Sequence, residues 1–172
     1  MAKPGVFLAL LGAAILAAGA FGALHNQVSY SVGPEYFHQF KFRQFAIPPE
    51  LPPRIGAAIV GWRASWWMGV VVGLPPFLLG LLLMAPARKY WSAGLRAVVA
   101  VITTTALASG IGLIFGLVTV EAQLVSKLPL PDAITDRVGF VRSGVMHDAS
   151  YLGGFVGIFV AVWVIFRASR KD

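Results

Sequence analysis

The chain has 172 residues, of which 58% are hydrophobic and only 12% are charged, and its mean hydropathy is +0.77. A soluble domain of this size is far less apolar, so the composition places the chain in a lipid bilayer. The formal charge of +7 does not indicate nucleic-acid binding, because the basic residues flank apolar runs and form no stripe on a polar face. No cysteine is present, which excludes disulfides and thiolate metal sites.

The first apolar run covers residues 5–24 and follows a short start that contains one lysine. Such a start resembles a signal peptide, but the run is as long as a bilayer-spanning helix, roughly 20 residues. We interpret it as the first membrane helix. Small residues at a four-residue spacing would allow a neighbouring helix to approach closely, although an alanine-rich helix without a specific partner has the same pattern. These residues are Ala14, Ala18 and Gly22.

A long polar and aromatic loop follows, over residues 25–64. Its first part alternates apolar and polar residues around Tyr30, which predicts a short extended segment over residues 28–32. Pro34 and Glu35 suit the first turn of a helix that would run to Phe45. A hairpin is the alternative for this aromatic stretch, because its phenylalanines also alternate. Four prolines between residues 48 and 53 then end any regular structure.

The second span is predicted over residues 65–85. Arg63 should lie at the membrane interface, because an arginine at the bilayer centre costs roughly 2.5–3.5 kcal/mol. Pro75 and Pro76 lie within the span and predict a kink, since they leave two backbone carbonyls without their helical partners. Ser109 of the third span is the predicted partner for these carbonyls.

A short basic connection over residues 86–96 leads to the third span, residues 97–120. The second outer loop, residues 121–146, contains Pro131 and predicts a short surface helix there. The last span is predicted over residues 147–166, which makes His147 its first residue. Small residues recur at helix-packing spacing in both spans. They are Ala108, Gly112, Gly116, Gly153 and Gly157.

The distribution of charge predicts the orientation. Seven basic residues lie beside helix ends in short segments on the side of the two termini, and six of the seven acids accompany the two long loops. Short segments rich in lysine and arginine stay in the cytoplasm. We therefore expect a bacterial cytoplasmic (inner) membrane protein with both termini in the cytoplasm.

In this topology several polar helix ends fall in one layer near the outer surface. The candidate binding residues are His25, Tyr30, Glu35, His38, Arg63, Glu121, His147, Asp148 and Tyr151. Three interpretations remain open: a structural hydrogen-bonded layer, a polar binding or proton-transfer site, and a metal or haem site. The candidate metal ligands are His25, Glu121, His147 and Asp148. The sequence requires no cofactor, and Arg63 could pair with Glu121 or Asp148.

The sequence gives little support for an enzymatic function. The chain has no GxSxG elbow, no phosphate-binding glycine loop and no HExxH pattern. An enzyme that acts on lipid with His147 and Asp148 as base and orienting group would lack an obvious nucleophile. The two central spans contain no acid or base, whereas a proton pump or ion-coupled transporter normally has one there.

Three segments carry a resemblance. The run HNQVSYSVGPEYF, the run GWRASWWMG and the run MHDASYLGG are similar to a group of small uncharacterised bacterial integral membrane proteins, some described only as signal-peptide-containing. The resemblance covers about a third of the chain and implies no activity. Gly33 stands where a helix-capping serine is expected.

The sequence thus predicts an all-α membrane protein with four transmembrane helices and a short aromatic, amphipathic cap on the outer side. We expect one domain over residues 1–172. Its expected role is non-enzymatic, as an accessory or assembly subunit of a larger membrane complex whose partners are lipid and other membrane proteins. The alternative is a metal- or cofactor-binding redox or transport protein that uses the outer polar layer.

Overall fold

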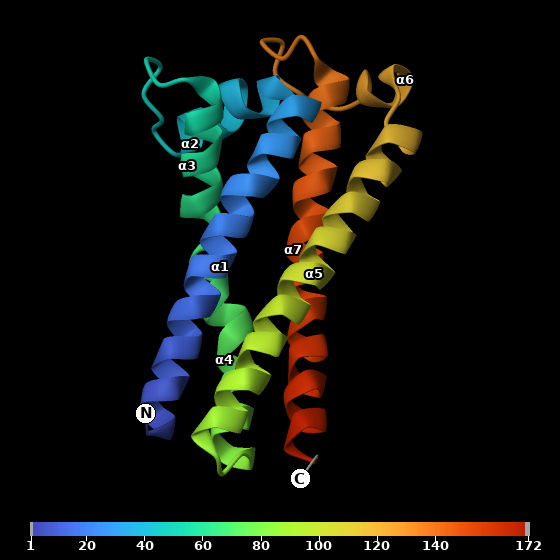
Figure 1. Cartoon of the computed structure of the whole chain (residues 1–172). Coiled ribbons are helices and arrows are strands. Elements are labelled where there is room, and N and C mark those ends of the chain that lie inside the picture. Colours follow the sequence, from blue (N-terminus) through green and yellow to red (C-terminus); the bar gives the residue numbers. More distant parts are fainter. Residues whose placement is uncertain (1, 171–172) are drawn as a thin grey trace.

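The computed structural model describes residues 2–170, which form helices and no strand. Four helical segments are long and apolar enough to cross a membrane, so the predicted all-α membrane fold is confirmed. The helices in chain order are α1 (Lys3–Val32), the π-helix η1 (Tyr36–Lys41), α2 (Phe42–Gln44), α3 (Pro53–Ser65), α4 (Met68–Leu83), α5 (Ala87–Thr119), α6 (Ala122–Val125) and α7 (Arg137–Ser169). Figure 1 shows the spans side by side, with α3 and α4 forming one of them.

Helix α1 continues to Val32, so the predicted extended segment over residues 28–32 is wrong. The polar residues in this stretch do not leave the bundle. His25, Asn26 and Ser29 are buried at helical spacing, where each side chain contacts a polar group of a neighbouring helix. The helix ends at Gly33, whose backbone N–H donates to the Ser29 carbonyl. A Cβ at Gly33 would lie 2.1 Å from the Gly139 carbonyl oxygen, so close contact with α7 explains this glycine.

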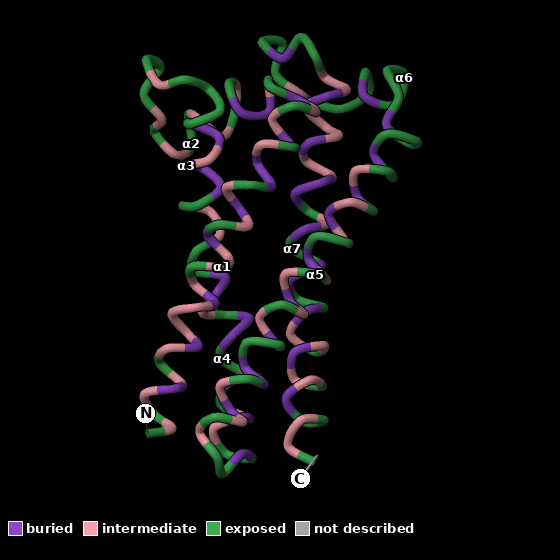
Figure 2. The backbone as a smooth tube through the Cα atoms, viewed as in Figure 1, coloured by how far each residue is buried: buried purple, intermediate pink, exposed green. Residues whose placement is uncertain are grey.

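The aromatic segment, residues 34–45, is helical as predicted and forms no hairpin. Tyr36 and Phe37 are buried and pack against Ala57 of α3. The segment thus covers the upper part of the bundle where α1, α3 and α7 meet (Figure 2).

The second span is interrupted at Trp66 and Trp67, upstream of its two prolines. Backbone bonds there shorten to the i−3 pattern, and Gly69 follows against the backbone of Ala14. Helix α4 continues through Pro75 and Pro76. The predicted role of Ser109 for the carbonyls beside these prolines is wrong, because the Ser109 hydroxyl contacts His25 instead.

Helix α5 begins at Ala87, so the predicted connection over residues 86–96 is mostly helix. Only Met84, Ala85 and Pro86 separate α4 from α5. Tyr90 is fully buried in this hairpin and donates a 2.8 Å hydrogen bond to the Phe77 carbonyl. The basic residues of the stretch therefore lie on the first turns of a helix.

Helix α7 begins at Arg137, and the predicted start at residue 147 is wrong. Asp136 caps it by accepting a 2.8 Å hydrogen bond from the Gly139 N–H. The short helix predicted at Pro131 is also wrong, since the loop's helix is α6. Arg142 donates to the carbonyls of Gly116, Leu117 and Val120 at the end of α5, and the Gly116 carbonyl also accepts from the Val120 N–H. His147 consequently lies about three turns inside α7.

Small residues stand where the spans approach most closely. Gly22 of α1 meets Gly61 of α3, and a Cβ on either would lie within 2.3 Å of the other's carbonyl oxygen. Between α5 and α7 the close pairs are Gly112 with Ala149, Gly153 with Ala108, Gly157 with Val101 and Gly116 with Arg142. Ala14 is buried against α4, whereas Ala18 lines a cavity. Backbone proximity of this kind is the usual basis of helix association in lipid.

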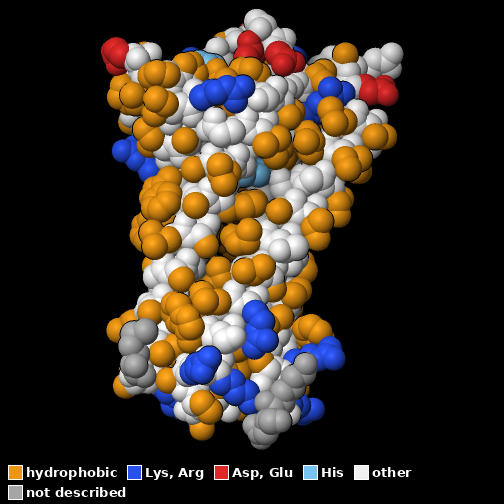
Figure 3. Space-filling model, in the orientation of Figure 1, with side chains coloured by type: hydrophobic (Ala, Val, Ile, Leu, Met, Phe, Trp, Pro, Cys, Tyr) orange, Lys and Arg blue, Asp and Glu red, His pale blue; other side chains and the backbone are white. Residues whose placement is uncertain are grey.

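The start of α1 and the end of α7 lie at the same end of the molecule (Figure 1). In the view of Figure 3, lysine and arginine side chains lie at both ends with an apolar belt between them, whereas acidic side chains are seen at the end opposite the start of α1 and the end of α7. The two long loops share that opposite end.

Candidate functional site

A cluster of polar side chains is buried between α1, α5 and α7 beneath the aromatic segment. We refer to it as the histidine cluster. Its members are His25, Asn26, Ser29, Ser109, Ser143, His147 and Ser150. On α1 three members lie within five residues, and on α7 three lie at steps of four and three, so each set shares one helix face. The face of α1 meets the face of α7 because both helices extend well beyond their predicted ends.

His147 links three helices. Its Nδ1 lies 2.8 Å from the Ser143 carbonyl oxygen and 3.2 Å from the Ser29 hydroxyl. Its Nε2 lies 3.1 Å from Oδ1 of Asn26, and the Asn26 amide donates a 2.9 Å bond to the Ala57 carbonyl of α3. Only 8% of the His147 residue surface is exposed.

His25 is less completely bonded. Its Nδ1 lies 3.1 Å from the Ser109 hydroxyl, whereas its Nε2 is buried without a hydrogen-bond partner. The residue is 9% exposed, and its ring stands edge-on to His147 at a centroid distance of 4.8 Å. A buried ring nitrogen without a partner is costly, so this atom marks a place for a further polar group.

The aromatic segment forms the roof of the histidine cluster. The Tyr36 ring lies 4.9 Å from the His147 ring, and Phe37 lies 6.1 Å from it. Burial raises the pKa of Tyr36, and the nearby carboxylate of Asp148 adds to this increase. Burial lowers the pKa of Lys41, against the attraction of Asp148. Asp148 is itself exposed on α7 and therefore faces the roof from outside the cluster.

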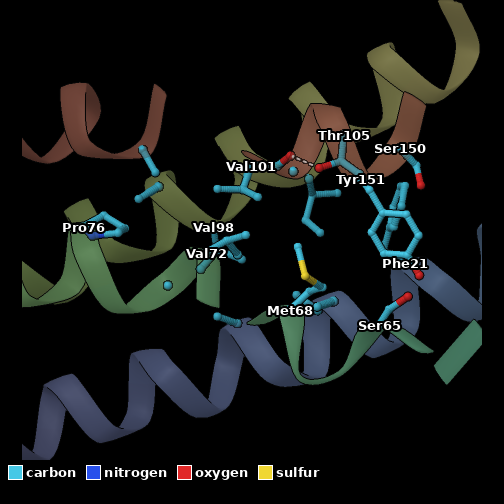
Figure 4. Close-up of a pocket in the computed structure, with 18 of the residues that line it drawn as sticks. Phe21, Ser65, Met68, Val72, Pro76, Val98, Val101, Thr105, Ser150 and Tyr151 are labelled. Atoms are coloured by element: carbon cyan, nitrogen blue, oxygen red, sulfur yellow. Dashed lines mark hydrogen bonds between the residues drawn. The ribbon is translucent and has the colours of Figure 1, made fainter. Parts of the chain in front are cut away.

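A partly enclosed cavity of about 60 Å³ extends from the histidine cluster towards the middle of the bundle. All four spans line it. Figure 4 shows Ser65, Ser150 and Tyr151 at one end and Pro76 at the other, with apolar side chains between them. A smaller space of about 30 Å³ shares the first end and adds both histidines to the lining. The two spaces together have a polar end and an apolar end.

The other candidate residues lie elsewhere. The Tyr30 hydroxyl near the end of α1 lies 3.0 Å from Nε2 of His38, an exposed residue of η1. Glu35 accepts hydrogen bonds from the Thr135 hydroxyl and, at 2.9 Å, from the Asp136 N–H. The first of these bonds is the main reason why the pKa of Glu35 is below its usual range. Tyr30 and His38 thus join α1 to η1, Glu35 binds the loop before α7, and none of the three belongs to the histidine cluster.

Arg63 and Glu121 do not form the predicted pairs. Arg63 is exposed and donates a 3.1 Å hydrogen bond to the Phe45 carbonyl. Glu121 is exposed at the start of α6. Within residues 2–170, no three histidine, aspartate or glutamate side chains lie close enough together to hold a metal ion. The predicted ligands His25, Glu121, His147 and Asp148 are not brought together as one set, since among them only the two histidines meet across helices.

Sequence reasoning missed the roles of Asn26, Ser29 and Ser143, and assigned Ser109 to other atoms. A signal was available in the spacing, because Ser143, His147 and Ser150 fall on one face of a helix. This spacing indicates a shared face only if α7 begins upstream of Ser143. The polar residues around His147 instead favour a helix that begins at residue 147.

No protein family model, curated protein or solved structure matches this chain. The class of protein is therefore described from its fold and its candidate site. It is a membrane protein of four apolar spans that enclose a buried two-histidine cluster.

Proposed function

We propose that the protein binds a small amphipathic molecule from the lipid phase and does not act as an enzyme. The polar head of this molecule would lie at the histidine cluster and its apolar part in the adjoining cavity. The observation that carries this proposal is the Nε2 atom of His25, which is buried without a partner next to a space lined by all four spans.

The chemistry of the site limits the head group. A histidine nitrogen can donate to a carbonyl or accept from a hydroxyl, and the hydroxyls of Ser65 and Tyr151 add further hydrogen-bonding capacity at the same end. The side chains around the larger cavity are mostly apolar, which disfavours a strongly charged group there, and Lys41 in the lining of the smaller space disfavours a cationic head group. The ligand class is therefore a neutral lipid-like molecule with one hydroxyl or carbonyl head.

The cavity fits part of such a molecule. A volume of about 60 Å³ exceeds the space that a single water needs, which is roughly 10–15 Å³ by the same type of measure. The lining of Met68, Val72, Val98 and Val101 offers no partner for a row of waters (Figure 4). Apolar chains from the bilayer suit this lining better, and the rest of the ligand would remain among the lipids.

The proposal also includes the membrane in which the protein resides and its orientation there. A bacterial cytoplasmic membrane with both termini in the cytoplasm is supported by the basic side chains at the end where α1 starts and α7 ends (Figure 3). The head of the ligand would then lie near the outer leaflet.

Replacing His25 with phenylalanine should remove the bound molecule while retaining the fold. We expect organic extraction and mass spectrometry of gently purified wild-type protein to find one lipid-like compound in stoichiometric amount. We expect the His25→Phe variant to contain at least about tenfold less, which is the effect of losing roughly 1.4 kcal/mol of binding free energy. The matched control is His38→Phe, because His38 lies outside the cluster and should leave the compound bound. Equal amounts in all three samples, or none in the wild type, would contradict the proposal.

A second candidate function is that of an accessory or assembly subunit. Apart from their own helix, Gly12 of α1 and Gly110 of α5 have no atom of residues 2–170 within 4 Å of the position of a Cβ, so the described part of the chain packs nothing against them. We expect Gly110→Leu to reduce co-purification of a membrane partner by at least about tenfold, while Leu107→Val, at an exposed neighbouring position, leaves it unchanged. A wild-type protein that purifies alone would exclude this function.

A further inference from the structure

A neutral His147 imidazole has one N–H donor, but both of its ring nitrogens face oxygen atoms that accept hydrogen bonds. Its Nδ1 faces the Ser143 carbonyl at 2.8 Å, and its Nε2 faces Oδ1 of Asn26 at 3.1 Å. A carbonyl oxygen can only accept. The Asn26 amide nitrogen is occupied by the Ala57 carbonyl at 2.9 Å, which fixes the end of the amide that turns towards His147. Both ring nitrogens therefore face acceptors.

No neutral arrangement satisfies all three contacts. A neutral imidazole carries one N–H, so one of its nitrogens would turn a lone pair towards an oxygen. Rotating the Asn26 amide by half a turn repairs the contact with His147 but places its oxygen against the Ala57 carbonyl. The Ser29 hydroxyl, at 3.2 Å, can donate to Nδ1, but the Ser143 carbonyl then faces a lone pair. An imidazolium donates from both nitrogens and satisfies every contact.

We infer that His147 is a proton-binding site whose charged form joins α1, α3 and α7 through Asn26, Ala57 and Ser143. The ligand is H⁺, so this site goes beyond the proposed amphipathic ligand and does not depend on it. Proton uptake gives the ring a second N–H, so that neither ring nitrogen turns a lone pair towards an oxygen. Proton release leaves one ring nitrogen with its lone pair against an oxygen and weakens the contact with Asn26 or with Ser143.

The groups around His147 decide how readily it charges. His25 of α1 faces its ring, Tyr36 and Lys41 face it from η1, and Asp148 and Tyr151 follow it on α7. The contacts described from α3 and α5 are the uncharged groups Ala57 and, through His25, Ser109. The ammonium of Lys41 repels a charged ring, and the carboxylate of Asp148 attracts that ammonium. The charge is thus stabilised by hydrogen bonds to two oxygens, without an ion-pair partner within the cluster.

Nitrogen-15 NMR of histidine-labelled protein tests this inference. The ring shifts distinguish the imidazolium from both neutral tautomers, and a His147→Gln sample assigns the signal. We expect the His147 signal to convert to the imidazolium form as the pH falls from about 8 to about 4, the range around the usual histidine value. Folded protein in which His147 carries a single proton throughout this range would overturn the inference.

Variants of Asn26 make the test specific. Asn26→Leu removes one acceptor, so the proton affinity of His147 should fall by about tenfold to a hundredfold, which is the usual effect of a hydrogen bond to a charged group. Asn26→Asp supplies a carboxylate and should shift the midpoint to higher pH, which keeps the test decisive if the leucine variant does not fold. Ser109→Ala is the control, because within residues 2–170 the Ser109 hydroxyl bonds to His25 and is not among the hydrogen-bond partners of His147. An unchanged midpoint in the Asn26→Asp variant would overturn the inference whether or not an amphipathic ligand is found.

Discussion

Replacing Gly61 with alanine should destabilise the protein strongly. The new Cβ would lie 2.1 Å from the carbonyl oxygen of Gly22 and 2.8 Å from the backbone nitrogen of Ala23. These are backbone atoms of α1, so no side chain can rotate away and the two helices must separate. Overpacking costs about 1–3 kcal/mol in well-packed cores. We expect a loss at or above the upper end of this range, measured by denaturant unfolding in detergent.

Gly12→Ala is the matched control for Gly61→Ala. Gly12 lies on α1, where no atom approaches within 4 Å of its Cβ position. Alanine is a better helix former than glycine by about 1 kcal/mol, so this variant should be as stable as the wild type or more stable. If Gly61→Ala unfolds at the same denaturant concentration as Gly12→Ala, the close crossing of α1 and α3 is wrong.

Replacing Phe37 with alanine should open the roof of the histidine cluster. Phe37 is fully buried against Tyr36, Ala57 and the His147 ring. Truncating a buried phenylalanine typically costs 3–5 kcal/mol, because the cavity that remains collapses only in part. We expect a loss of about this size and faster hydrogen exchange at the amides of α1 and α7 beside the cluster.

Phe40→Ala tests whether burial, and not aromatic content, is responsible for this effect. Phe40 belongs to the same π-helix but is 41% exposed. Its truncation should cost less than about 1 kcal/mol, in the range of surface substitutions. Equal losses for Phe37→Ala and Phe40→Ala would contradict the assignment of Phe37 as the roof.

The apolar runs of the sequence predicted the four spans, because hydropathy reports where a chain cannot be exposed to water. The ends of the helices were harder to predict. His25 and His147 look like residues that leave the membrane, yet they are buried where Asn26, Ser109 and Ser143 provide hydrogen bonds. A polar residue does not end a helix when a neighbouring helix satisfies it.

The candidate site was predicted only in part for a related reason. The two histidines were identified, but the contact between Asn26 and His147 joins residues that are 121 positions apart. Only the way α1 and α7 pack decides this contact. The cap of α7 is different, because Asp136 is a local signal that favours a helix start at Arg137. The polar residues that follow Asp136 hide this signal in the sequence, because they resemble a loop that precedes the helix.

The lengths of the helices have a consequence for the surrounding membrane. Helix α7 has 33 residues and measures about 50 Å, whereas the hydrocarbon layer is about 30 Å thick. Counting about 20 residues from Arg167 towards the start of α7 reaches His147, so the histidine cluster falls where lipid tails give way to head groups. Hydrophobic mismatch then acts directly on this cluster. A thicker bilayer would surround the two imidazoles with hydrocarbon and would oppose protonation of His147. A thinner bilayer would place both rings at the level of the head groups and water.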